Sequence, residues 1–395
     1  MKSFVREQKM NFGNKKWIYR FLFLAFLSFF LAGILGVIMR FYPFISVSIP
    51  FENLLHSHSH TALLGWAFLG CTTGVLHYFP IAKKALKNYY YLFFISILGM
   101  FFSFLYQGYG LISISFSTLY IFLVYHLFWN LHRKIHTTGT ADILLKRSII
   151  WFYISTLGIW ILGPSSAILG KEHWLYHTSI RFFLHFQING WLFYAILGLI
   201  LKNREITFNN LWIIRLLDAS LILTTFLPLY WVDKNLIFYI LNALGVLAQF
   251  ASIYLLVNIL YKSKIIISKN IITMWLVFIV IKAMSQLPTL FPSFAEELKL
   301  NRSLILTYLH WVLLGIVSFG LILNYLDTKI IRNTPLFKFS FYTLLVGFLA
   351  TEAILFCLGN HIYLSHNTVL MAIFSIFLLI GITGFLWKIY RRNII

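Results

Sequence analysis

The chain has 395 residues, of which 60% are hydrophobic and only 11% charged, and its mean hydropathy is +0.83. A water-soluble domain of this length could not bury so much apolar surface, so the composition excludes a soluble globular protein and predicts an all-α membrane protein. The formal net charge of +21 does not indicate nucleic-acid binding, because the basic residues lie in short breaks between apolar runs. The two cysteines, Cys71 and Cys357, lie within apolar runs, which excludes a disulfide framework.

Twelve apolar segments are long enough to form helices that cross a bilayer, which takes about 20 residues each. They cover about 18–42, 58–80, 89–106, 110–131, 148–169, 180–201, 211–231, 236–261, 271–291, 303–326, 338–358 and 367–389. No small-residue cleavage site follows the first segment, so we expect a retained helix, not a signal peptide. The sequence therefore predicts a single polytopic membrane domain over 1–395, without a soluble domain.

Basic residues set the predicted direction of these spans. If the N-terminus is cytoplasmic, all but seven of the 32 Lys and Arg residues fall at cytoplasmic ends and loops. The seven are Arg40, Lys171, Arg181, Lys234, Lys282, Lys299 and Arg302. An error in the number of spans would scramble this alternation, so we expect both termini in the cytoplasm and the chain in the inner membrane of a bacterium.

Three spans place a histidine at a similar depth below the outer surface: His60 in the second, His185 in the sixth and His310 in the tenth. His310 follows the outer end of its span by about seven residues, or roughly 10 Å. An imidazole within a membrane needs a partner, either a hydrogen-bonding group on a neighbouring helix or a metal. Three at matched depth favour a metal or haem, for which imidazole is the usual axial ligand. His56 and His58 are expected to form a water-exposed rim.

Two of these spans carry motifs of a known family. Twelve spans with both ends inside, and the second span with its HTALL segment at 60–64, resemble subunit I of the haem–copper oxidases and nitric-oxide reductases. The resemblance implies that His60 is a ligand of the low-spin haem. The tenth span reads TYLHWVLLGIVSFG at 307–320, which implies His310 as the second low-spin ligand and puts Tyr308 where the family has its high-spin haem ligand.

Other positions depart from the family. In the sixth span His185 stands where the family has a copper ligand, but Asn189 replaces the Tyr or Glu that follows it. The seventh span has no histidine in 211–235, where the family has a pair of copper ligands. The resemblance therefore implies one low-spin haem b on His60 and His310. We do not expect copper or a second haem, and if a further metal is present, His185 is its predicted ligand.

The outer-side arginines Arg40, Arg181 and Arg302 are candidates to bind the haem propionates, because arginine pairs with carboxylates through two parallel hydrogen bonds. The same residues are equally suited to lie at the membrane interface with their charged ends in water. Beyond the lipid bilayer, the resemblance implies a cytochrome c-like or quinol electron donor and accessory subunits. No nucleic acid is expected.

Three functions remain open from the sequence. In the first, the chain is a haem-b-binding membrane protein that transfers electrons, or senses redox state or gases, through a bis-histidine low-spin haem. In the second, it is an oxidoreductase, a divergent catalytic subunit that reduces oxygen or nitric oxide with His185 and further ligands such as His56, His58 or Tyr308.

The third function is that of a transporter or structural membrane protein without a cofactor. Ionisable residues inside the spans favour it, since such groups are costly in lipid and are functional candidates. They are Lys282 in the ninth span, Glu352 in the eleventh, and Arg215 and Asp218 in the seventh, which we expect to form an ion pair at i, i+3.

Overall fold

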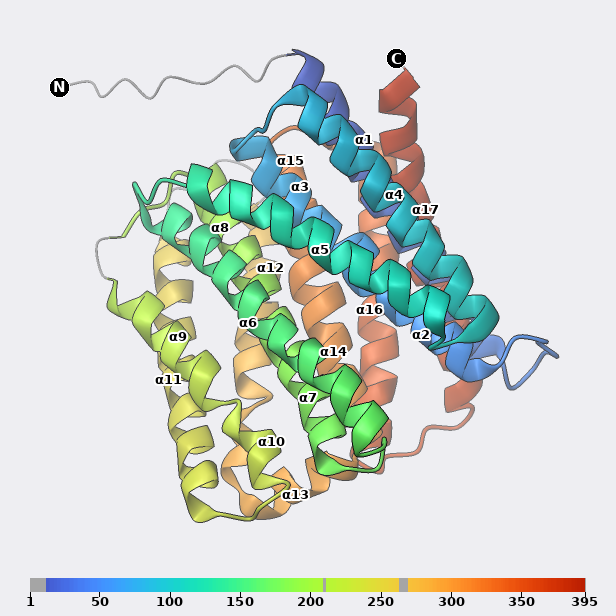
Figure 1. The fold of residues 1–395 in the computed structure, drawn as a ribbon, viewed down its shortest axis with the longest axis vertical. Coiled ribbons are helices and arrows are strands. Elements are labelled where there is room, and N and C mark those ends of the chain that lie inside the picture. The colour runs from blue at the N-terminus through green and yellow to red at the C-terminus, as the bar shows by residue number, and fades with distance from the viewer. Residues whose placement is uncertain (1–11, 209–210, 263–268, 395) are drawn as a thin grey trace. The chain divides into compact units, whose positions relative to one another are not determined.

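The structure is a computed structural model, which describes residues 12–208, 211–262 and 269–394 (Figure 1). All regular structure within these ranges is helical, and none of it is β-strand. Contacts between the helices divide the chain into two compact units. Unit 1 comprises Met1–Leu127, Thr334–Leu344 and Ile376–Ile395, and unit 2 comprises Phe128–Asn333 and Leu345–Ser375.

Unit 1 is built around a continuous helical stretch in the middle of its fold. The stretch consists of α2 (Phe51–His60), the π-helical η1 (Thr61–Phe68) and α3 (Leu69–Tyr78). It packs against α1 (Phe12–Phe41) and α4 (Lys83–Gln107). Trp66 of η1 stacks on Phe29 of α1, with ring centroids 4.4 Å apart, and the Ser57 hydroxyl of α2 donates to the carbonyl of Phe101 of α4 at 2.9 Å.

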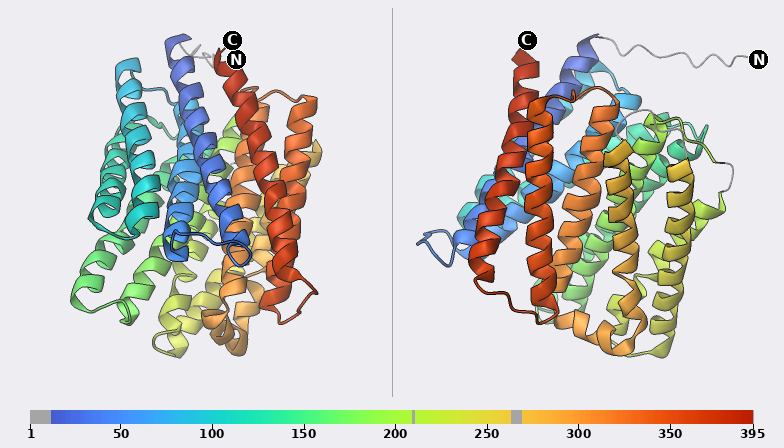
Figure 2. Two further views of the ribbon diagram at one scale, coloured as in Figure 1. Left: turned by 90° about the vertical axis from the view of Figure 1, so that its right-hand side faces the viewer. Right: turned by 180° about the vertical axis from the view of Figure 1, so that it is seen from behind.

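Unit 2 contains the remaining membrane helices and several short ones. They are α6 (Thr140–Ile168), α7 (Trp174–His185), η2 (Phe186–Leu192), α8 (Phe193–Asn203), α9 (Trp212–Leu223), α10 (Phe226–Tyr230), α11 (Leu236–Lys262), α12 (Lys269–Met284), η3 (Leu287–Leu290), α13 (Pro292–Leu300), α14 (Arg302–His310), η4 (Trp311–Ser318) and α15 (Phe319–Asp327). Helix α11 lies between α9 and α12 (Figure 2). Three further helices contain residues of both units: α5 (Leu111–Lys134), α16 (Pro335–Gly359) and α17 (Asn367–Ile394).

Eleven helices of the described residues are long and apolar enough to cross a membrane, which confirms an all-α, multi-pass membrane protein. Every predicted span overlaps a helix. The span predicted at 58–80 is helical over Phe51–Tyr78, but it is not among the eleven. Its side chains from Leu63 to Leu76 are all buried, so this stretch meets protein and does not need an apolar surface toward lipid. The number twelve stays a prediction.

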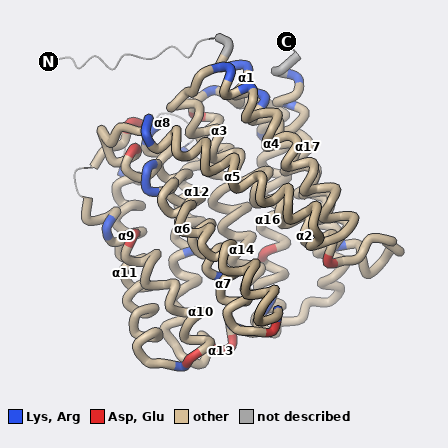
Figure 3. The backbone as a smooth tube through the Cα atoms, viewed as in Figure 1, with Lys and Arg blue, Asp and Glu red and all other residues tan. Residues whose placement is uncertain are grey.

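The basic residues of unit 1 gather at the end where α1 begins and α17 ends (Figure 3). This common end agrees with termini on one side of a membrane, and its assignment to the cytoplasm stays a prediction. Four of the residues counted toward that side, Lys2, Arg6, Lys9 and Lys264, lie outside the described residues.

Candidate functional site

Each of the three histidines is the last residue of an α-helix and is followed directly by a π-helical stretch. His60 ends α2 and precedes η1, His185 ends α7 and precedes η2, and His310 ends α14 and precedes η4. The α-helices before them have 10, 12 and 9 residues, so the three lie at similar distances from the helix starts. π-Helix makes up well under 1% of protein residues and is frequent at functional sites. The three positions are therefore the best candidates for a site.

His60 lies in unit 1 with its ring held from both sides. Its Nδ1 is 2.9 Å from the carbonyl oxygen of His56, and a carbonyl can only accept, so Nδ1 carries the proton. The lone pair is then on Nε2, which lies 3.3 Å from the Tyr109 hydroxyl. The Phe104 ring packs over the imidazole at 4.2 Å between centroids. Nε2 thus carries the lone pair of the ring, and its hydrogen-bond partner is a half-exposed tyrosine.

The two other histidines of α2, which were predicted to form a water-exposed rim, are partly buried, and each contacts protein. The Nδ1 atom of His58 is 2.9 Å from the carbonyl oxygen of Ala32, which joins α2 to α1. The His56 ring packs edge-on against Tyr109 at 4.5 Å. Both residues support the helix that carries His60.

His310 lies in unit 2 next to a buried carboxyl group. Its Nδ1 is 3.2 Å from Oε1 of Glu352, and only 2% of the Glu352 side chain is exposed. Nε2 of His310 has no hydrogen bond to any described residue. The start of α14 is fixed by Asn301, whose Oδ1 caps the Leu304 N–H at 3.1 Å and whose Nδ2 donates to the Gly359 carbonyl of α16 at 2.7 Å. A carboxylate that orients a histidine through Nδ1 is the usual support of a metal-binding imidazole.

In His185 the ring nitrogen that contacts a protein oxygen is Nε2, whereas in His60 and His310 it is Nδ1. Nε2 of His185 lies 2.8 Å from the carbonyl oxygen of Leu221 on α9, so Nε2 is the protonated nitrogen and Nδ1 carries the lone pair. Helix α7, which carries it, is capped at its start by His173, whose Nδ1 accepts from the Leu175 N–H at 3.2 Å. The part of the chain that the structure describes contains no group of three or more His, Cys, Asp or Glu side chains arranged to hold a metal ion.

Asn189 and Tyr308, which the resemblance placed at the family's second metal site, are in direct contact. The Tyr308 hydroxyl donates to Oδ1 of Asn189 at 2.7 Å and accepts from Nε2 of Gln286 at 2.9 Å. Both hydrogen-bonding functions of the phenol are therefore satisfied by protein. Gln286 was not predicted as part of this group, although a polar amide at the end of an apolar span was a signal for it.

Of the three arginines predicted to bind propionates, Arg40 lies in unit 1, and the two in unit 2 have different surroundings. The guanidinium of Arg181 stacks over the ring of Trp231 at 4.8 Å, an arrangement that leaves the edge N–H groups of the guanidinium available. Arg302 is exposed at the first position of α14. Neither position tests the predicted role.

The predicted ion pair between Arg215 and Asp218 is wrong. Asp218 instead pairs with Arg147 of α6 and accepts a hydrogen bond from the Tyr194 hydroxyl of α8 at 3.0 Å. Arg215 is exposed and stacks on Trp212 at 5.2 Å. A spacing of three residues allows the pair on an isolated helix, but here α9 turns Asp218 toward α6 and α8 while Arg215 points outward.

No protein-family model matches the chain, and no curated protein matches its sequence. The interpretation of the site therefore depends on its side chains.

Proposed function

We propose that this chain is a membrane haem protein in which His60 and His310 are the axial ligands of one low-spin haem b. It would serve single-electron transfer, or the sensing of redox state or gases. The observation that carries the proposal is the matched arrangement of the two rings. Each ends an α-helix before a π-helical stretch, and each has Nδ1 held by a protein group so that Nε2 is the nitrogen left for iron.

The donor chemistry of both residues fits this cofactor. A bis-histidine haem supplies reversible one-electron transfer and has no open iron position for a substrate. The protein's part is to orient the rings: the His56 carbonyl fixes the rotation of His60, and Glu352 fixes that of His310. To bind iron, Nε2 of His60 would give up its contact with the Tyr109 hydroxyl. His60 belongs to unit 1 and His310 to unit 2, and their pairing on one haem is proposed from the sequence motifs.

The remaining parts of the proposal follow the resemblance to oxidase subunit I. They include twelve spans in a bacterial inner membrane with both termini cytoplasmic, and a cytochrome c-like or quinol donor with accessory subunits. Arg302 and Arg181 are proposed to pair with the propionates, since arginine combines charge with a planar array of donors. The exposure of Arg302 and the stacked guanidinium of Arg181 are compatible with that role.

The test is a reduced-minus-oxidised spectrum and a haem count on the full-length protein purified from membranes in detergent. We expect one haem per chain in the wild type. His60→Ala and His310→Ala should each abolish the bis-histidine spectrum, because a six-coordinate low-spin iron needs both imidazoles. His361→Ala is the matched control, since that side chain is 72% exposed and should leave the spectrum unchanged.

Purified wild-type protein without a Soret band would overturn the proposal, as would an unchanged spectrum in both ligand variants. One equivalent of copper or non-haem iron, or two haems per chain, would favour the catalytic reductase instead. Total metal analysis of the same sample distinguishes these outcomes.

A further inference from the structure

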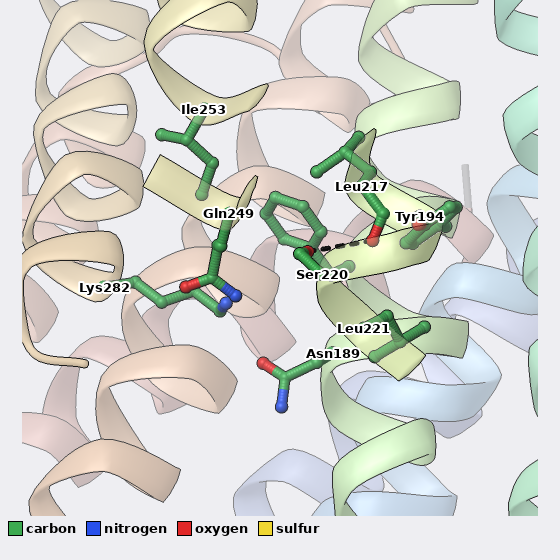
Figure 4. Close-up of a pocket in the computed structure, with 9 residues that line it drawn as sticks. Asn189, Tyr194, Leu217, Ser220, Leu221, Gln249, Ile253 and Lys282 are labelled. Atoms are coloured by element: carbon green, nitrogen blue, oxygen red, sulfur yellow. Dashed lines mark hydrogen bonds between the residues drawn. The ribbon is translucent and has the colours of Figure 1, made fainter. Parts of the chain in front are cut away.

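A small cavity within unit 2 is lined by Lys282 of α12 together with polar side chains from four other elements. These are Asn189 of η2, Tyr194 of α8, Ser220 of α9 and Gln249 of α11 (Figure 4). The side chains of Lys282 and Gln249 converge on the cavity from their two helices. The free space holds a group of about the size of one water molecule.

Lys282 has a buried amino group that forms no ion pair with any described residue. Its side chain is 1% exposed and lies within the membrane helix Lys269–Leu290. Among the described residues, no carboxylate forms an ion pair with Nζ and no acceptor hydrogen-bonds to it. The contact that it does make is with the ring of Phe193, whose centroid is 5.2 Å from Nζ. A buried ammonium group is costly unless a negative partner or several acceptors compensate it.

The acidic residue on the helices that line the cavity, Asp218, interacts with other side chains and not with Lys282. Asp218 of α9 pairs with Arg147 and accepts from the hydroxyl of Tyr194, which itself lines the cavity. His185, at the end of α7, is bonded to the carbonyl of Leu221 and offers no negative charge. Among the described residues, the elements around the cavity therefore leave no acidic side chain to pair with Lys282.

The amides at the cavity are able to donate hydrogen bonds. Oδ1 of Asn189 accepts from Tyr308, which leaves the NH₂ group of this amide as its remaining function. Gln249 is 6% exposed, and its Oε1 has no hydrogen-bond partner. No hydrogen bond at Oε1 fixes the orientation of this amide, and its NH₂ group is free to serve a ligand. An ammonium group surrounded by amide donors is the chemistry of an anion site.

We propose that this cavity binds a small monovalent anion, of the size of a halide, through the ammonium group of Lys282 and the amides of Gln249 and Asn189. The anion provides the negative charge that the protein does not. The small volume selects against larger anions such as sulfate and gluconate. The proposal is independent of the haem, because none of the residues that line the cavity is a proposed haem ligand.

The experiment uses the purified full-length protein in detergent, in gluconate buffer of constant ionic strength, with sodium bromide as the probe. The midpoint of thermal unfolding is followed by tryptophan fluorescence. A ligand that binds the folded state raises this midpoint in a saturable manner. We expect such a rise with bromide and none with sulfate. In Lys282→Met the half-saturating bromide concentration should increase on the order of tenfold or more, because a charge-assisted contact is lost.

Lys234→Met is the matched control, since the Lys234 side chain is 66% exposed, and it should respond to bromide as the wild type does. Gln249→Leu should show a smaller increase in half-saturating bromide than Lys282→Met. Absence of a saturable bromide effect in the wild type would overturn the proposal, as would an equal effect of sulfate. Wild-type half-saturation in Lys282→Met would do the same. If Lys282→Met does not fold, wild-type half-saturation in Gln249→Leu overturns the proposal.

Discussion

At the scale of single residues, the position of the proton on each imidazole decides what that imidazole can bind. A carbonyl oxygen faces Nδ1 of His60, and a carboxyl oxygen faces Nδ1 of His310. For His185 the carbonyl faces Nε2. The two nitrogens of a histidine are not equivalent, and the hydrogen bond at one determines the role of the other. The structure thus separates His185 from the two proposed haem ligands.

Glu352 gives a prediction at this scale. Glu352→Leu removes the acceptor of His310 Nδ1 and leaves a buried N–H without a partner, whereas Glu352→Gln keeps an oxygen in place. Loss of an orienting partner typically lowers metal affinity by about 10–100-fold. We expect Glu352→Leu to lose most of its haem on purification, and Glu352→Gln to keep most of it. The measurement is the ratio of haem to protein, and full haem content in Glu352→Leu would show that Glu352 does not position His310.

At the scale of elements, glycines allow the helices to approach closely. A methyl group built at Gly65, Gly190, Gly315 or Gly320 would lie 2.6–2.8 Å from a side-chain atom of a neighbouring helix. Small residues have this use in membrane helix bundles, where packing replaces the hydrophobic effect between helices. The same closeness leaves no room beside these glycines for a flat cofactor.

Gly158 of α6 provides the element-scale prediction. A Cβ atom there would lie 2.6 Å from the Ser179 carbonyl oxygen and 2.9 Å from the Phe183 nitrogen, both backbone atoms of α7. Backbone cannot move as a side-chain end can, so Gly158→Ala should destabilise the protein by about 1–3 kcal/mol. Leu157→Ala is the control, because Leu157 is 53% exposed on the outer face of the same helix. Thermal unfolding in detergent checks both, and equal midpoints would contradict the close contact.

At the scale of the whole molecule, one of the twelve predicted spans is not apolar enough to count as a membrane span by composition, and it is well buried. The stretch Phe51–Tyr78 is not among the eleven helices apolar enough to span by composition, yet its central residues are covered by protein within unit 1. A helix needs an apolar surface where it faces lipid, and a helix covered by protein can carry polar residues on the faces that meet its neighbours. Whether this stretch crosses the membrane therefore depends on which side of the membrane each of its two ends lies.

Cysteine labelling tests that topology in a variant without Cys71 and Cys357. Ser46→Cys precedes the stretch and Lys84→Cys follows it, and both positions are exposed. If the stretch spans, an impermeant maleimide should label Ser46→Cys in intact cells and Lys84→Cys only after the membrane is opened. Labelling of both in intact cells, or of neither, would show that the two positions lie on one side.

Much of the fold and part of the site were predictable from the sequence. Helical class and approximate span limits follow from the length and apolarity of each segment, which are local properties. The same pattern placed His60, His185 and His310 inside three of the predicted spans, but α2 and α7 begin at Phe51 and Trp174, six or seven residues before the predicted starts at 58 and 180. The short helix α13 and the π-helical stretches η1, η2 and η4 were not predicted, because the periodicity of a uniformly apolar segment does not distinguish helix types.

The sequence by itself thus determined that this chain is a bundle of apolar helices and which histidines lie within them. Only the tertiary structure decided the partner of each buried polar group. Asp218 meets Arg147, 71 positions earlier, and not Arg215 in its own helix, and Glu352 meets His310, 42 positions away. Lys282 meets no acid at all among the described residues. These pairings depend on how helices distant in the chain rotate and pack against one another, which no local pattern encodes.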